Sequence, residues 1–431
     1  MKAIVCPKYG SPDALHLEEA IKPALGDDQM LIKVHAAFIN SRDWRLMRAK
    51  PSFDRLVKGG LLRPKNPILG VNMAGQVEDA GSGVRQFQPG DEIFGYLSRY
   101  GGRTFAEYVC AGENEAALKP DNVTFEQAAA VPLAALTALQ ALRNHGNIQP
   151  GQKVLINGAS GGVGTFAVQI AKAFGTEVTA VCSTRNMEMV RSIGADHAID
   201  DKNREFTQDG QQYDLILAVN GNHPISDYLR ALKPEGIYVV AGGSMAQLFQ
   251  AATIGKGISN TGRQKTHIVS QVPNLDDLLF LKDLCASGKI MPVIDACYPL
   301  SKTPDAFWYF EKAHPMGKVV ITMEENQNVQ GERKTSNAAA DRYIAHCGND
   351  CTQCPLYKYD CMEGCRGTAC ANYCETCAVR LCNRKYSIAN CAQCEEYPCQ
   401  ILEKQYENMA KDGYGDWALA ARKALEEIQR G

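Results

Sequence analysis

The chain has 431 residues, too many for a single hydrophobic core, so two or three domains are expected. Its 46 lysines and arginines nearly balance 48 aspartates and glutamates, and a formal net charge of −2 argues against a nucleic-acid partner. The N-terminus lacks the apolar core of a secretory signal, and the most apolar long run, residues 128–142, is shorter than the ~20 residues of a membrane helix. We therefore expect a cytoplasmic protein that does not enter a membrane.

The first 125 residues are predicted to form a β-rich domain. Short apolar runs, separated by glycine and proline, are typical of strands joined by tight turns. The clearest runs are residues 30–34, 75–78, 92–94 and 105–110.

The central stretch, residues 154–174, has the pattern of a nucleotide-binding strand, turn and helix. An apolar run at 154–156 leads into a glycine-rich turn, and apolar residues then recur at helical spacing over 165–174. Backbone N–H groups at such a turn, with a helix dipole behind them, bind phosphate. The residues predicted to contact the cofactor here are Ala159, Ser160, Gly161, Gly162, Val163 and Gly164.

The residues after the next predicted strand, 177–182, favour NADPH over NADH. In NAD-binding folds an acidic residue at this point holds the ribose hydroxyls. Ser183 and Arg185 follow the strand here, so no carboxylate repels a 2′-phosphate, and a hydroxyl and a guanidinium can bind one. Both residues are therefore predicted to contact the cofactor.

Further strands are predicted at residues 198–199, 213–219 and 236–241, with helical patterns between them. Strands that alternate with helices form a parallel, doubly wound sheet. We therefore predict an α/β protein in which a Rossmann domain follows the β-rich domain.

Three more stretches, together with the glycine-rich turn, resemble the medium-chain dehydrogenase/reductase superfamily. They are residues 69–77, 83–95 and 130–138. The likeness extends over about residues 1–323 and is to the zinc-free quinone oxidoreductase branch, which resembles zeta-crystallin.

The resemblance implies a division into domains. A GroES-like domain would comprise residues 1–125 and 296–323, and a Rossmann NADP-binding domain residues 126–295. The polar stretch 324–341 is expected to be a linker. A homodimer is left open as the assembly.

The resemblance also shows which groups are missing. Zinc-dependent members bind a catalytic zinc through a cysteine, a Gly-His-Glu motif and a later cysteine. The matching positions here read Asn40-Ser41-Arg42-Asp43 and Gly70-Val71-Asn72, which offer neither a thiolate nor an imidazole. The expected reaction is hydride transfer from NADPH to a small quinone or carbonyl substrate without zinc.

The same resemblance suggests site residues. Asn40, Asp43 and Thr137 are expected near the nicotinamide, where Asn40 could hydrogen-bond the substrate carbonyl. Tyr96 is our candidate proton donor, with a pocket wall as its alternative role. For Asp43 the alternative role is to cap or orient a turn.

Three further residues are expected to contact the cofactor. Gly242 and Gly243 are placed along it, and Lys318, before the last predicted strand, as a second phosphate contact. The family's acidic residue and Gly-Gly after the third strand are replaced here by Asn220-Gly221-Asn222, which puts the contacts at that edge in doubt.

The last hundred residues contain a dense group of cysteines. Twelve of the 17 cysteines fall between residues 347 and 399, and three Cys-x2-Cys pairs have the spacing that lets two sulfurs face one metal. In a reducing compartment such density indicates metal binding, and twelve thiolates suit up to three tetrahedral sites. The predicted ligands are Cys347, Cys351, Cys354, Cys361, Cys365, Cys370, Cys374, Cys377, Cys382, Cys391, Cys394 and Cys399.

We expect a cysteine-rich domain over residues 342–405 and a helical tail over 406–431. Zinc is the expected metal, and iron–sulfur clusters are the alternative. The segment resembles a prokaryotic cysteine-rich domain of unknown function, through Cys347-Gly348, Cys354-Pro355 and Pro398-Cys399. Alternatives for the whole chain are a sensor of NADPH or metal without turnover, and a reductase that passes electrons to an iron–sulfur module.

The segment 342–405 is predicted to fold only with metal bound. Its cysteines outnumber its large aliphatic residues, so burial at roughly 25 cal/mol per Å² cannot offset the entropy of ordering the chain. Structural zinc contributes on the order of 10 kcal/mol in small fingers. Circular dichroism and metal content of the isolated segment, with and without a strong chelator, check this. A segment that stays folded when metal-free and fully reduced would overturn the prediction.

Overall fold

A computed structural model describes residues 1–323, except for 50–63, 65, 98–100, 204–205, 208–209, 222, 244–247, 254–262 and 314. The chain divides into two compact units, residues 1–330 and 331–431, and all the described residues belong to the first. The predicted linker, the cysteine-rich domain with its twelve cysteines and the helical tail lie outside the described residues. No helix among the described residues is long and apolar enough to span a membrane.

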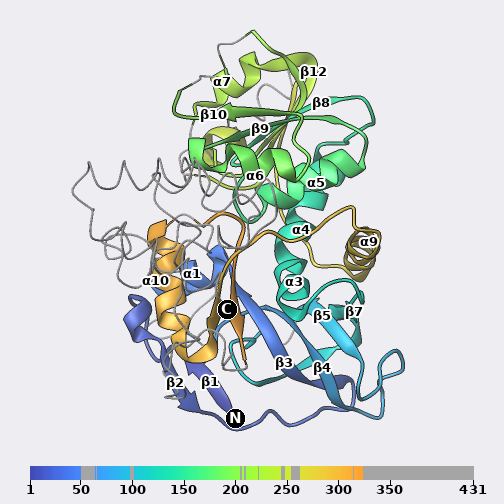
Figure 1. Ribbon diagram of the computed structural model, residues 1–431, viewed down its shortest axis with the longest axis vertical. Coiled ribbons are helices and arrows are strands. Elements are labelled where there is room, and N and C mark those ends of the chain that lie inside the picture. Colours follow the sequence, from blue (N-terminus) through green and yellow to red (C-terminus); the bar gives the residue numbers. More distant parts are fainter. Residues whose placement is uncertain are drawn as a thin grey trace, which may run out of the picture. The chain divides into compact units, whose positions relative to one another are not determined.

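The β-rich part is built around a seven-stranded sheet (Figure 1). Its central strand, β3, pairs antiparallel with β4, β6 and β15, so the chain returns near residue 318 to complete a sheet that it began near residue 29. The strands are β3 (Gln29–Ile39), β4 (Asn72–Ala80), β5 (Glu92–Tyr96), β6 (Tyr108–Gly112), β7 (Ala116–Leu118), β14 (Ile294–Pro299) and β15 (Lys318–Thr322). A separate hairpin joins β1 (Lys2–Val5) and β2 (His16–Glu19).

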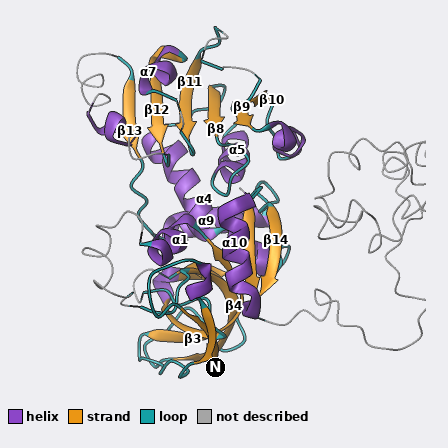
Figure 2. Ribbon diagram, turned by 90° about the vertical axis from the view of Figure 1, so that its left-hand side faces the viewer, coloured by secondary structure: helices purple, strands orange, loops and turns teal. Residues whose placement is uncertain are grey.

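The nucleotide-binding part is a six-stranded parallel sheet with the order β10-β9-β8-β11-β12-β13 (Figure 2). The strand order reverses between β8 and β11, and ligands of doubly wound sheets bind at the carboxyl ends of the strands at such a point. The strands are β8 (Lys153–Asn157), β9 (Glu177–Cys182), β10 (His197–Asp200), β11 (Tyr213–Ala218), β12 (Leu232–Val240) and β13 (Lys265–Ile268). The predicted α/β fold, a β-rich domain with a doubly wound parallel sheet, is confirmed.

Helices cover both sheets and connect them. The α-helices are α1 (Ser41–Arg48), α3 (Phe125–Ala130), α4 (Pro132–Leu139), α5 (Gly164–Ala173), α6 (Met187–Ser192), α7 (Ile225–Arg230), α9 (Leu275–Ala286) and α10 (Thr303–Ala313). Single turns are η1 (Pro12–Ala14), η2 (Glu113–Glu115), η4 (Thr184–Asn186) and η5 (Leu300–Lys302), and η3 (Gln140–His145) is π-helical.

One apolar cluster runs from the first sheet into the second. It includes Phe38 and Phe94 of the first sheet and Val154 and Ile156 of the second. Buried alanines of α3 and α4 lie in the same cluster, and their small side chains allow close packing between the elements. The two sheets therefore share one core, which holds the glycine-rich turn against the β-rich part.

Several strands differ from their predicted bounds, and two of them show why. The run 105–110 contains Ala106, which bridges Ala3, and continuous pairing with β3 starts only at Tyr108. Strand β12 begins at Leu232, four residues before its predicted start, because Leu232 pairs with Tyr213 across a register shift. Both shifts come from long-range pairing, which local apolar patterns do not encode.

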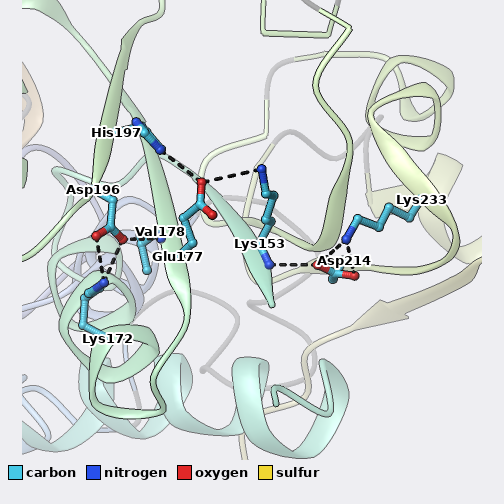
Figure 3. Close-up of polar contacts among 8 residues, drawn as sticks. All are labelled: Lys153, Lys172, Glu177, Val178, Asp196, His197, Asp214 and Lys233. Carbon is cyan, nitrogen blue, oxygen red and sulfur yellow. Dashed lines mark hydrogen bonds and ion pairs between the residues drawn. The ribbon is translucent and has the colours of Figure 1, made fainter. Parts of the chain in front are cut away.

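Ion pairs tie the amino ends of the parallel strands, opposite the glycine-rich turn (Figure 3). The backbone N–H of Lys153 donates to the Asp214 carboxylate at 2.8 Å, and Lys233 pairs with the same carboxylate at 2.9 Å. Lys172 pairs with Asp196 at 2.8 Å. Such half-exposed pairs contribute little stability individually, so we regard this edge as structural.

Candidate active site

The glycine-rich turn leaves the carboxyl end of β8 and packs closely against the start of α5. Gly158 has a φ of +83°, and its N–H and that of Ala159 donate to the Val181 carbonyl at 3.1 Å. A Cβ on Gly164 would lie 2.1 Å from the Gly158 carbonyl oxygen, whereas a Cβ on Gly161 would meet nothing closer than 3.5 Å. Gly164 is therefore required for packing, and Gly161 leaves open space at the turn's surface.

A buried lysine lies beside this turn. A Cβ on Gly162 would be 2.7 Å from Nζ of Lys318, which is 4% exposed. The ammonium group lies over the rings of Phe38 and Phe166, at 4.5 and 5.6 Å from their centres. Burial lowers the pKa of Lys318 to about 7, and no ion pair to it occurs among the described residues. An anionic group at the turn would raise that pKa.

The turn is also tied to its neighbours. Asn186 donates to Oγ of Ser160 at 2.8 Å, and the N–H of Gly317 donates to the Ser160 carbonyl at 2.9 Å. Gly242 approaches β11 so closely that a Cβ there would lie 2.4 Å from the Val219 carbonyl oxygen. The predicted loop residues therefore gather at the strand ends where the sheet order reverses. The backbone N–H groups of residues 162–164, with Lys318, fit a dinucleotide pyrophosphate.

Two other predicted cofactor contacts show internal bonds. Gly243 bridges Gly221 across the same strand ends. The hydroxyl of Thr137, on α4, donates to the Leu133 carbonyl at 2.7 Å. The hydroxyl thereby bonds back to the carbonyl four residues earlier in its own helix, so the side chain is held in one orientation.

The residues predicted to bind a 2′-phosphate stand just after β9. Ser183 is half-buried and precedes η4. Arg185 is exposed, and its guanidinium donates to the Ala313 carbonyl at the end of α10 at 2.9 Å. A cation suits a helix C-terminus, so Arg185 would have to share or exchange this partner to bind a phosphate.

Asn40 and Asp43 form a capping box at the start of α1. The Asn40 side chain accepts the N–H groups of Arg42 and Asp43 at 2.7 and 3.1 Å, and the Asp43 carboxylate accepts from the backbone and side chain of Asn40. Asp43 is 2% exposed, and burial raises its pKa to about 7. The structure thus shows both side chains orienting the helix start, the alternative expected for Asp43.

Tyr96, at the end of β5, lines a cavity of about 210 Å³. Its phenol oxygen accepts a hydrogen bond from Nη1 of Arg42 at 2.7 Å. Burial raises the pKa of Tyr96, and the Arg42 cation opposes that shift. The cavity is lined by Tyr96, Asn114, Glu115, Leu136, Pro273, Asn274 and Leu278. Leu136 belongs to α4, the helix that also carries Thr137, a residue expected near the nicotinamide.

The donor set at the positions of the family's catalytic zinc does not suit that metal. Asn72 is fully buried, and its side-chain oxygen accepts the N–H of Leu133 at 3.0 Å. Within the part of the chain that the structure describes, no three His, Cys, Asp or Glu side chains gather to hold a metal ion.

Sequence reasoning missed two residues of the site, Arg42 and Asn186. Each contacts a predicted residue, Tyr96 and Ser160 respectively, across 54 and 26 positions of the chain. The capping pattern Asn-Ser-Arg-Asp indicates a helix that starts at Ser41 and has Arg42 in its first turn, but no local signal links Arg42 to Tyr96.

Two known families match parts of the chain. Residues 26–121 match the family described as alcohol dehydrogenase GroES-like domain, and residues 193–321 the family described as zinc-binding dehydrogenase. The chain is 34% identical over 337 residues to a chloroplastic quinone-oxidoreductase homolog of Spinacia oleracea, covering 74% of this chain and 98% of that protein. It is 33% identical over 333 residues to a chloroplastic NADPH-dependent alkenal/one oxidoreductase of Arabidopsis thaliana, covering 74% and 79%.

A solved structure is also similar. The quinone oxidoreductase from Coxiella burnetii superposes with a TM-score of 0.67 at 30% identity, covering 75% of this chain and 99% of that one.

Two glycine substitutions are predicted to separate packing from cofactor binding. Gly161→Ala has room in the protein but places a methyl group where the phosphate would approach, so NADPH binding should weaken about tenfold or more with little change in Tm. Gly164→Ala forces a clash with the Gly158 carbonyl and should destabilise the fold by about 1–3 kcal/mol. Fluorescence titration with NADPH and thermal melting measure both. Unchanged NADPH affinity in Gly161→Ala would contradict the assignment of the turn.

Proposed function

The chain belongs to the medium-chain dehydrogenase/reductase superfamily as an oxidoreductase of the quinone oxidoreductase type, and we propose that it reduces a quinone, enone or aldehyde with NADPH and without catalytic zinc. The nicotinamide cofactor follows from the family. The observation that carries the proposal is the buried Lys318 ammonium beside Gly162 of an open glycine-rich turn, at the edge where the sheet order reverses. A buried cation at that point favours a bound phosphate.

NADPH would be held at its pyrophosphate and at its 2′-phosphate. The N–H groups of residues 162–164 and the Lys318 ammonium suit the pyrophosphate, and Ser183 and Arg185 suit the 2′-phosphate. Thr137, Gly242 and Gly243 would contact the nucleoside and the nicotinamide. When bound, this cofactor supplies a hydride to the substrate.

The protein must then stabilise the oxygen that becomes negative in the substrate. Asn40 is committed to capping α1, so we assign it, with Asp43, to shaping the site. Tyr96 is buried and lines the cavity, and burial keeps its phenol protonated at neutral pH. We therefore assign to Tyr96 the proton that the oxygen receives. Leu136, Pro273 and Leu278 give the cavity apolar walls that suit a small quinone or enone.

The absence of zinc chemistry is proposed from the donor set. The stretches Asn40-Ser41-Arg42-Asp43 and Gly70-Val71-Asn72 match the zinc-binding motifs. Within them Asn40 and Asp43 cap α1, and Asn72 accepts a hydrogen bond from α4. Neither thiolate nor imidazole is offered there, so a zinc ion that could act as a Lewis acid would have no ligands.

Three further proposals rest on less of the molecule. The twelve cysteines from Cys347 to Cys399 are proposed to bind zinc, with iron–sulfur as the alternative, on sequence spacing alone. A homodimer is proposed because β13 ends the described sheet and its Ile268 is 37% exposed. A cytoplasmic location is kept as a proposal, and the two relatives named above are chloroplastic.

Residues 1–323, expressed alone, are predicted to oxidise NADPH with a quinone or enone in the presence of a chelator. All the family motifs and every proposed contact lie in this span, so neither zinc nor the cysteine-rich segment is required. Steady loss of absorbance at 340 nm with menadione, before and after dialysis against a chelator, measures this. Activity that the chelator removes from the truncated protein would refute the zinc-free proposal.

Arg185→Ala is predicted to weaken NADPH binding by about 1–3 kcal/mol and to leave NADH binding nearly unchanged, because a charged hydrogen bond to the 2′-phosphate is lost. Arg230→Ala is the matched control, since that exposed arginine on α7 pairs only locally with Asp227. Titrations of both variants with both cofactors decide the matter. Equal weakening of NADPH and NADH would show that Arg185 acts through its bond to α10 instead.

A further inference from the structure

Arg42 contacts Tyr96, the residue proposed to donate the proton, but the proposed function gives Arg42 no role. It is the second residue of α1, and the Asn40 cap accepts its backbone N–H at 2.7 Å. Its Nη1 donates to the phenol oxygen of Tyr96, 54 positions along the chain, at 2.7 Å. The capping box thus fixes the point from which the arginine reaches the phenol.

This bond determines how the phenol can act. A tyrosine hydroxyl has a single proton to donate, and in Tyr96 the oxygen already accepts from Arg42. No acceptor for the phenolic proton is found among the described residues. The ring is 6% exposed and borders the cavity, so a substrate oxygen in the cavity is a suitable acceptor.

The charges around the phenol oppose one another. Burial raises the pKa of Tyr96 most, and Asp43 on α1 and Glu115 on η2 raise it further. Arg42 is the one cation acting on it among the described residues, and it lowers the pKa both as a charge and as a hydrogen-bond donor. Without Arg42, the phenolate would be formed in a buried setting with two carboxylates nearby.

We propose that Arg42 is a positioning residue for the reduction, which holds the phenol of Tyr96 toward the substrate and stabilises the phenolate left after proton transfer. This inference rests on the proposed function. The hydride brings two electrons to the carbonyl carbon of an aldehyde or to the conjugated carbon of an enone or quinone, a π electron pair moves to the carbonyl oxygen, and NADPH becomes NADP⁺. The Tyr96 O–H bond breaks as the substrate O–H bond forms. The phenolate then recovers its proton from water.

The full-length protein tests this with Arg42→Met, Arg42→Lys and Tyr96→Phe. The probes are menadione and 2-hexenal at saturating NADPH, with kcat measured from pH 6 to 11. Arg42→Met should lower kcat about 10- to 100-fold, a part of what a general acid contributes. It should also move the alkaline limb of the kcat profile to higher pH, because loss of the cation raises the pKa of the phenol. Arg42→Lys keeps a charge and should restore part of kcat with the limb near its original place.

Controls separate this role from a structural one. Arg45→Met changes an exposed arginine on the same helix and should leave kcat and its pH profile unchanged. Tyr96→Phe should abolish the alkaline limb. NADPH affinity and Tm, measured for every variant, should stay near those of the unmodified protein.

The outcomes are distinguishable. If the unmodified protein turns over neither probe, the proposed function fails. If it is active and Arg42→Met keeps its kcat and alkaline limb, the function stands and the role of Arg42 is overturned. A lowered kcat with an unshifted limb also overturns that role, because a purely structural effect would give this result. Should Arg42→Met not fold, Arg42→Gln, which also lacks the charge, makes the same comparison of kcat and of the position of the limb.

Discussion

The site depends on the burial of the Lys318 ammonium group against two aromatic rings. This group lies over Phe38 of β3 and Phe166 of α5, so one aromatic ring comes from the sheet of the β-rich part and the other from the helix that follows the glycine-rich turn. Burying a charge without a counterion is costly, and burial already lowers the pKa of this lysine to about 7. A cofactor phosphate at Gly162 would supply the missing charge. Cofactor binding and the packing of the two sheets are therefore linked through one side chain.

The return of the chain as β15 is what places that lysine. Strand β15 pairs with β3, and the N–H of Gly317, just before it, bonds the Ser160 carbonyl of the turn. The alanine-rich helices α3 and α4 carry the same core from one sheet to the other. The alanine side chains of these helices are small and pack densely. They therefore hold the turn to the β-rich part without large movable side chains. The cavity beside Tyr96 thus has walls fixed by both parts.

Local patterns were enough to predict the elements that carry the cofactor. The apolar run before the turn, the helical spacing after it and the alternation beyond it each need only a few neighbouring residues. Lys318 was predicted as a phosphate contact, but its burial between two aromatic rings was not, since they come from positions 38 and 166. Arg42 and Tyr96 meet only because α1 and β5 are brought together by the sheet. The cysteine-rich segment stays a prediction from spacing.

The most direct measurement is a crystal structure of the full chain with NADP⁺. We predict that the pyrophosphate lies on the N–H groups of residues 162–164, with Nζ of Lys318 within hydrogen-bond distance of a phosphate oxygen. We also predict that C4 of the nicotinamide faces the cavity beside Tyr96. A pyrophosphate bound away from Lys318, or a nicotinamide that faces away from the Tyr96 cavity, would contradict the prediction.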